Sequence, residues 1–184
     1  MKTLIVVLII LVVLAVLAVG VYNGLIRRRN QVENAWAQID VQLKRRLDLI
    51  PNLVETVKGY AAHEKDTLQA VIEARNKALA APPSPVAQAG ADAQLGGALR
   101  GLLALSEAYP DLKANTNFLA LQEELSATEG RVSYARQFYN DAVLGYNNKL
   151  DSFPSVIFAR MLNFVRREYF EAEEGARQAP TVKF

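Results

Sequence analysis

The strongest constraint on the fold of this chain is an apolar run near its amino terminus. Residues 4–21 read LIVVLIILVVLAVLAVGV and contain no polar side chain. A helix needs roughly 20 apolar residues to cross a hydrocarbon core about 30 Å thick. A helix that packs against a soluble core instead keeps one polar face. The run therefore predicts a transmembrane anchor over residues 1–24.

A cleavable signal peptide is the competing interpretation of this run. The leader MKT carries one basic residue, and the small residues AVG at 18–20 resemble a cleavage site. The apolar run, however, is longer than the roughly 7–15 residues usual for a signal peptide. A triple arginine also follows it, as a stop-transfer flank would. We therefore expect the anchor to be retained. The expected membrane-flanking residues are Tyr22, Arg27, Arg28 and Arg29.

The charges on either side of the run predict an orientation. One lysine and the amino terminus precede the run, whereas three arginines follow it closely. Cytoplasmic flanks carry the excess of lysine and arginine. We therefore expect the amino terminus outside and the rest of the chain in the cytoplasm. The opposite orientation stays open, because Lys2 opposes the bias and the absence of cysteine is compatible with either side.

Beyond the run, apolar residues recur with helical spacing. From Val32 to Val71 they are separated mainly by three or four positions, which predicts a helix. The phase is kept across Pro51. We therefore expect one helix over residues 22–80, kinked near Ile50, because proline removes a backbone donor and clashes with the preceding turn. A hairpin at Pro51 is the alternative.

The next part of the chain alternates connections with shorter helices. Residues 81–91, APPSPVAQAGA, predict a mobile connection. A short helix is expected over 92–108, and Pro110 ends it. Residues 111–116 predict a loop. Either Asn115 or Asn117 is expected to cap the helix that follows.

The clearest periodicity lies between residues 118 and 146. Apolar positions there alternate steps of three and four, which is typical of the seam of an antiparallel or coiled-coil-like bundle. Pro154 then separates a last apolar segment, and residues 171–184 predict an irregular tail. The predicted fold is all-α, with an N-terminal transmembrane helix followed by an elongated up-and-down antiparallel helical bundle over 25–170.

Residues that could carry chemistry are sparse. His63 is the sole histidine and there is no cysteine. A zinc-protease helix would need a second histidine at position 67, which is Thr67. No serine lies in a Gly-x-Ser-x-Gly elbow, and no glycine-rich phosphate loop is present. The net charge is +2 without a basic stripe, which argues against nucleic-acid binding. We expect no catalytic residue, metal, cofactor or small-molecule substrate; a hydrolytic enzyme is the weakest alternative.

One stretch of alternating charge predicts a surface for a partner. Asp40, Lys44 and Asp48 are spaced four apart and so share one helix face. A ladder of salt bridges among them is the alternative. Trp36 could lie in the core, between chains or against lipid headgroups, and Asn52 could satisfy a backbone group freed by Pro51. The candidate partner surface comprises Trp36, Asp40, Lys44, Arg45, Arg46, Asp48, Pro51 and Asn52.

A second candidate surface lies within residues 153–170, which combine aromatic side chains with arginines. Such a segment either packs against the bundle or lies in the membrane interface, where basic amphipathic helices with aromatic anchors are found. The candidate membrane-interface residues are Phe158, Arg160, Phe164, Arg166 and Arg167.

Three stretches after the apolar run carry a family resemblance. They read YNGLIRRRNQVENAWAQIDVQLKRRLDLIPNLVETVKGYAAHE, AYPDLKANTNFLALQEELSATEGRVSYARQFYNDAVLGYN and YFEAEEGARQAPTVKF. With the apolar run they make nearly the whole chain similar to the LemA family. The resemblance implies a bacterial-type single-pass protein of the cell (inner) membrane with a helical bundle domain, no established enzymatic activity and no agreed catalytic residues.

We therefore expect a scaffold or interaction protein that is anchored in the lipid bilayer and binds other proteins. Its first expected partner is a second copy of the chain, which would give a homo-oligomer. The alternative is an adaptor or chaperone-like partner of a membrane protease or transporter.

Overall fold

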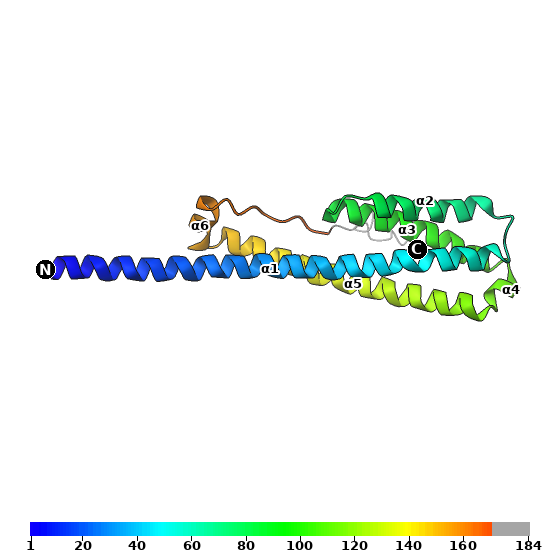
Figure 1. Cartoon of the computed structure of the whole chain (residues 1–184), viewed down its shortest axis with the longest axis horizontal. Coiled ribbons are helices and arrows are strands. Elements are labelled where there is room, and N and C mark those ends of the chain that lie inside the picture. The colour runs from blue at the N-terminus through cyan, green and yellow to red at the C-terminus, as the bar shows by residue number, and fades with distance from the viewer. Residues whose placement is uncertain (171–184) are drawn as a thin grey trace, which may run out of the picture. The chain divides into compact units, whose positions relative to one another are not determined.

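The computed structural model describes residues 1–170, and within them the chain is all-α without a strand, as predicted (Figure 1). The predicted tail at 171–184 lies outside the described residues. The chain divides into two compact units. Unit 1 contains residues 1–37 and 137–168, and unit 2 contains residues 38–136 together with 169 and 170. The helices are α1 (Lys2–Lys58), α2 (Lys65–Ala80), α3 (Pro85–Ser106), α4 (Pro110–Lys113), α5 (Thr116–Asp151) and α6 (Ser155–Met161).

Helix α1 continues through Pro51 and ends at Lys58, so the chain does not turn back at the proline. A proline at position 51 has no N–H to offer the Leu47 carbonyl, its partner in the α-helical pattern. The Arg75 Nε–H of α2 donates to that carbonyl at 3.0 Å. The Arg75 guanidinium thus provides the hydrogen bond that Pro51 cannot. The Asn52 side chain, which the sequence suggested as the partner of a backbone group freed by Pro51, is exposed.

The predicted single helix over 22–80 is wrong at residues 59–64, where the chain turns between α1 and α2. Gly59, which has low helical propensity, follows the last residue of α1. The amides of Tyr60 and Ala61 then donate to the Val57 carbonyl at 3.0 and 2.8 Å and close the helix end. Ala61 is buried and keeps the apolar phase across the turn. Periodicity alone therefore did not reveal the break.

The predicted connection over 81–91 is also wrong for most of its length, because α3 begins at Pro85. Ser84 is the N-cap, and its hydroxyl accepts a hydrogen bond from the Ala87 amide at 3.3 Å. A proline fits the first turn of a helix, where its missing N–H would have no intrahelical partner. The prolines that indicated a loop therefore mark a helix start.

Two further boundaries differ from the prediction. The short helix α4 occupies part of the loop predicted at 111–116. Helix α5 extends to Asp151, past the end of the predicted periodicity at residue 146. Asn115 is confirmed as the cap, since its Oδ1 accepts from the Phe118 amide at 2.9 Å.

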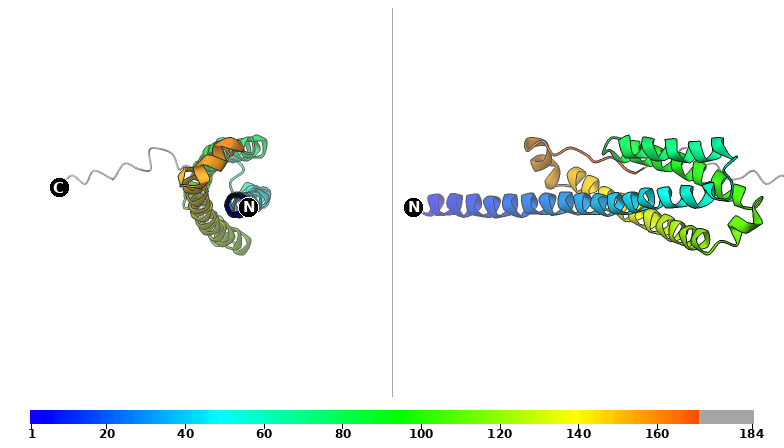
Figure 2. Two further views of the ribbon diagram at one scale, coloured as in Figure 1. Left: turned by 90° about the vertical axis from the view of Figure 1, so that its left-hand side faces the viewer. Right: turned by 45° about the vertical axis from the view of Figure 1, so that its right-hand side comes forward.

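The core of unit 2 is formed by apolar faces of α1, α2, α3 and α5. Helices α2 and α3 lie side by side (Figure 2). The predicted seam of α5 is confirmed, because its repeating positions in this unit are buried, apart from the half-buried Leu121. The buried seam residues are Phe118, Leu125, Thr128, Val132 and Ala135. The largest fully buried side chains that α1 adds here are Ile50, Leu53 and Val57.

In unit 1 the helices α1 and α5 run antiparallel, as predicted. Gly24 faces Lys149, Gly145 faces Arg28, and the Trp36 ring contacts Tyr139 farther along α1. The first buried side chain of the chain is Leu25.

The apolar run that precedes Leu25 is exposed. Its most apolar 18-residue window is 0% buried, and α1 is the one helix within residues 1–170 that is long and apolar enough to cross a membrane. Exposure of so much apolar surface is costly in water and favourable in lipid. The run therefore indicates a membrane location.

Candidate interaction site

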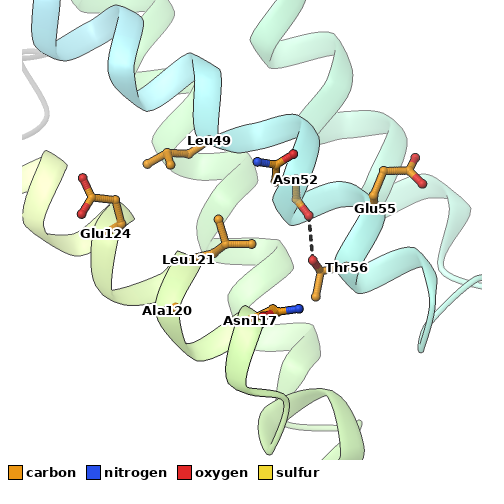
Figure 3. A pocket seen from close by; sticks show the side chains of 8 residues that line it. All are labelled: Leu49, Asn52, Glu55, Thr56, Asn117, Ala120, Leu121 and Glu124. Carbon is orange, nitrogen blue, oxygen red and sulfur yellow. Dashed lines mark hydrogen bonds between the residues drawn. The ribbon is translucent and has the colours of Figure 1, made fainter.

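An open groove lies between α1 and α5 in unit 2, with a volume of about 540 Å³ (Figure 3). Its apolar floor is formed by Leu49 from α1 and by Ala120 and Leu121 from α5. Figure 3 shows the Leu121 side chain pointing from α5 toward α1. Grooves of this kind, apolar at the base and polar at the rim, accept the apolar face of a helix. The polar rim consists of Asn52, Glu55, Thr56, Asn117 and Glu124.

The two amides on the rim are available to a partner. The Thr56 hydroxyl donates to the Asn52 carbonyl at 2.8 Å and is therefore engaged with its own helix (Figure 3). The side chains of Asn52 and Asn117 are exposed and form no hydrogen bond within residues 1–170. A bound segment could thus meet donors and acceptors on both walls.

The acidic end of the rim is fixed by two arginines. The Glu124 carboxylate lies 2.5 Å from an Arg45 nitrogen and 3.5 Å from an Arg131 nitrogen. Arg45 was predicted as part of a partner surface. It instead joins α1 to α5, although half of its side chain stays exposed. Exposed ion pairs of this kind add little stability, typically about 0–1 kcal/mol.

A charge cluster lies inside unit 2. The Arg46 guanidinium donates to Asp92 Oδ1 at 2.7 Å, and Arg136 donates to Asp92 Oδ2 at 2.5 Å. The side chains of Arg46 and Asp92 are each only 6% exposed. The Arg136 guanidinium also lies 4.7 Å from the centre of the Phe170 ring. Asp92 therefore links α1, α3 and α5 through two charge-assisted hydrogen bonds.

The prediction of Arg46 as a surface residue is wrong. It lies three positions after Leu43 and next to Leu47, both of which are buried. Its place on the apolar face of the helix was therefore readable from periodicity. Asp92 likewise falls three positions from both Ala89 and Leu95 on the buried face of α3. A charge at such a position is a signal of a buried pair.

The alternating charges of α1 face solvent. Asp40, Lys44 and Asp48 are exposed, and within residues 1–170 no ion pair joins them. These three residues therefore do not form the salt-bridge ladder that was the alternative. Pro51 and Asn52 continue the same exposed face toward the groove.

Trp36 packs within unit 1. Its ring meets that of Tyr139 edge-on, with centroids 5.6 Å apart, and the side chain is half-buried. Such pairs stabilise by about 0.5–1.5 kcal/mol beyond area burial. Trp36 thus packs partly against α5 inside the fold, and the rest of its side chain stays exposed.

An extended segment after α6 is fastened to α5 by side chains. The hydroxyls of Tyr139 and Tyr146 donate to the carbonyls of Glu168 and Val165 at 2.9 and 3.0 Å. The Asn147 amide both donates to and accepts from the backbone of Arg167 at 3.0 Å. Burial raises the pKa of Tyr139 and Tyr146, which keeps both hydroxyls protonated as donors.

Three of the four predicted membrane-flanking residues contact other side chains of unit 1. Tyr22 meets Phe164 edge-on, with ring centroids 6.3 Å apart. Arg28 donates to Gln31 at 3.2 Å, and Arg29 pairs with Glu33 at 3.8 Å. The remaining arginine of the triplet, Arg27, is exposed.

The predicted membrane-interface residues are mostly engaged within unit 1. Phe158 and Phe164 are half-buried. Arg166 pairs with Asp151 at 2.9 Å, and Arg167 pairs with Glu33 at 3.3 Å. Arg160 is exposed. The exposed apolar side chains of α6 are instead Ile157 and Met161. The sequence pattern did not distinguish them from the half-buried Phe158.

No catalytic constellation is assembled around the residues that invited one. His63 is exposed. Its neighbour Glu64 accepts a hydrogen bond from the Tyr109 hydroxyl at 3.0 Å, which raises the pKa of Tyr109. Within residues 1–170, no three His, Cys, Asp or Glu side chains gather as a metal site would need.

Comparison with known proteins identifies one family and several similar proteins. The model of the LemA family matches residues 35–184. Protein LemA of Metamycoplasma hominis is 28% identical over 157 residues, which cover 85% of this chain and 71% of that protein. Magnetosome protein MamQ 2 of Paramagnetospirillum magneticum is 25% identical, covering 88% of this chain and 68% of the relative. Magnetosome protein MamQ of Magnetospirillum gryphiswaldense is 24% identical with the same coverage.

Proposed function

Because the chain belongs to the LemA family, we propose that it is a membrane-anchored, non-catalytic scaffold that assembles with further copies of itself. The observation that carries this proposal is the open groove between α1 and α5 in unit 2. The apolar run of α1 would hold the copies in one bilayer, where a weak contact is strengthened by the high local concentration. The arginines after the run favour the cytoplasmic side for the remaining domain.

A ridge on α2 offers an occupant for the groove. Ile72 and Leu79 are seven positions apart and so lie on one face of the helix. They are 37% and 55% exposed. Lys65 begins the same face, and Glu55 stands on the rim of the groove. The α2 ridge (Ile72 and Leu79) therefore offers two apolar side chains to the groove, and Lys65 offers a charge opposite to that of Glu55.

The proposed contact is head-to-tail, because groove and ridge are different surfaces of the same chain. Such heterologous contacts build rings or filaments rather than closed two-fold dimers. Full burial of one leucine side chain contributes about 1.5–3 kcal/mol. Since about 1.4 kcal/mol corresponds to tenfold in Kd, one ridge residue controls a large part of a weak interaction.

Self-association can be measured by energy transfer between full-length copies in liposomes. The chain lacks cysteine, so donor and acceptor can be attached at the exposed site of an Asp141→Cys variant. We expect Ala120→Trp, which fills the groove, to weaken association at least about tenfold. Leu79→Asp, which removes the ridge, should have the same effect. Val86→Asp is the matched control, since Val86 is 57% exposed and lies outside both surfaces.

Mixing the two defective chains gives the sharper test. A chain with Ala120→Trp keeps its ridge, and one with Leu79→Asp keeps its groove, so the mixture should regain energy transfer. Recovery in the mixture is expected only if the groove of one copy binds the ridge of another. The proposal is wrong if neither variant differs from Val86→Asp, or if the mixture fails to recover.

The exposed charges Asp40, Lys44 and Asp48 favour a second candidate function, that of an adaptor for another membrane protein. Charged surfaces steer specific encounters more than they add affinity. A membrane protease or transporter that copurifies with the full chain, without self-association, would favour this alternative.

A further inference from the structure

We propose that α6 lies in the membrane–water interface, with Ile157 and Met161 on its outer face, and Phe153 just before it, among the headgroups and upper acyl chains of anionic lipids. The proposal goes beyond self-assembly, and it rests on the membrane anchoring proposed above. All the residues that carry it belong to unit 1.

Helix α6 carries its bulky apolar side chains on the outside. Ile157 and Met161 are 55% and 66% exposed, and their spacing of four places them on one face of the helix. Phe153, two residues before the helix begins, is 81% exposed. The fully buried side chains of α6 are small, namely Ser155 and Ala159, whereas Val156 and Phe158 are half-buried. A helix in water shows the reverse pattern, with its polar face outward. The exposed face is therefore suited to an apolar surrounding.

The turn after α6 fixes the helix at the level where α1 leaves its apolar run. Asn163 has a φ of 54°. Its amide donates to the Arg160 carbonyl at 3.3 Å, and the Phe164 amide donates to the Ala159 carbonyl at 2.9 Å. This pair of bonds is the Schellman arrangement that ends a helix. The turn places the Phe164 ring against the ring of Tyr22, the residue that directly follows the apolar run.

The exposed apolar surface continues past the helix. Leu162 and Val165 on either side of the turn are 44% and 76% exposed. Figure 2 shows α6 directly after the end of α5, where the chain folds back. The contact between Phe164 and Tyr22 joins this end of the chain to the exposed run of α1, which is the surface proposed to face lipid. This continuity favours lipid over a protein as the occupant.

The charges of unit 1 fit an anionic membrane surface. Residues 22–37 and 137–168 hold seven basic and four acidic side chains. Two of the acids, Glu33 and Asp151, are already paired with arginines. Arg27 and Arg160 are exposed and form no ion pair within the described part of the chain. Basic residues beside a transmembrane helix are attracted by anionic headgroups.

The test measures the depth of single fluorescent labels in full-length protein in liposomes that contain anionic lipid. Separate variants carry the label at Ile157→Cys, at Asp141→Cys on α5 of the same unit, and at Leu11→Cys in the apolar run. Lipids with a nitroxide on the upper acyl chain quench labels that lie among them. We expect loss of most of the fluorescence at position 157, which matches an interfacial depth of roughly 5–10 Å. The label at position 141 should keep its fluorescence.

Three outcomes separate this proposal from the anchor itself. Lipid quenching at 11 from deep nitroxides, without quenching at 157, would overturn the interfacial position of α6 and keep the anchor. Absence of quenching at both positions would overturn the anchoring as well. A label at 157 that is shielded from water but not quenched by lipid would place α6 against protein and so contradict the proposal. A Met161→Cys label repeats the measurement if the label at 157 disturbs folding.

Discussion

Replacing Asp92 with asparagine is expected to destabilise the protein by about 3–5 kcal/mol, the usual cost of leaving a buried charge without its partner. The Arg46 side chain is only 6% exposed, and its guanidinium donates a hydrogen bond to the Asp92 carboxylate. Arg136, which is 28% exposed, can turn toward water, but Arg46 cannot do so without unpacking α1. Urea unfolding followed by circular dichroism in detergent measures the change.

Two controls separate lost charge from general disturbance. Asp111→Asn neutralises an exposed aspartate and should change stability by no more than about 0.5 kcal/mol. The double variant Arg46→Met with Asp92→Leu removes both buried charges and is expected to be far less harmful than Asp92→Asn alone. An Asp92→Asn variant as stable as Asp111→Asn would show that Arg46 reaches water.

Replacing Arg75 with methionine is expected to cost about 1–3 kcal/mol, because it leaves the part-buried Leu47 carbonyl without a donor. Methionine keeps much of the aliphatic packing and removes the Nε–H that lies 3.0 Å from that carbonyl. The same unfolding measurement reports the loss. The effect arises only because residue 51 is a proline.

The dependence on Pro51 can be tested by a double-mutant cycle. Pro51→Ala returns a backbone N–H to the Leu47 carbonyl, so Arg75→Met should cost much less in that background. We expect a coupling energy of about 1 kcal/mol or more between the two sites. Additive effects would mean that the Arg75 contact does not compensate for the proline.

Elements with a local cause were predictable from the sequence. The apolar run and the seam of α5 follow from hydropathy and from repeats of three and four, and the cap at Asn115 follows from its short polar side chain. The break after Gly59 was missed because Ala61 keeps the apolar phase across it. The start of α3 was missed because a proline ends one helix and begins another with equal ease.

Contacts between distant helices were not predictable in the same way. Asp92 lies 46 residues from Arg46 and 44 from Arg136, and periodicity says only that each of these residues lies on or off an apolar face. The floor of the groove is formed by α1 and α5, and no repeat in one helix tells how far it stands from another. The sequence could not separate the exposed Ile157 and Met161 of α6 from the half-buried Phe158, because all three are apolar and lie within one short helix.

The most direct test of the membrane-anchored scaffold is the fate of residues 1–21 in the mature protein. Membranes from expressing cells are washed with alkaline carbonate, and the mass of the intact chain is measured in the pellet and in the wash. We predict that the chain stays in the pellet and keeps the whole apolar run. A chain that begins near residue 21 and appears in the wash would contradict the anchor and every proposal that depends on it.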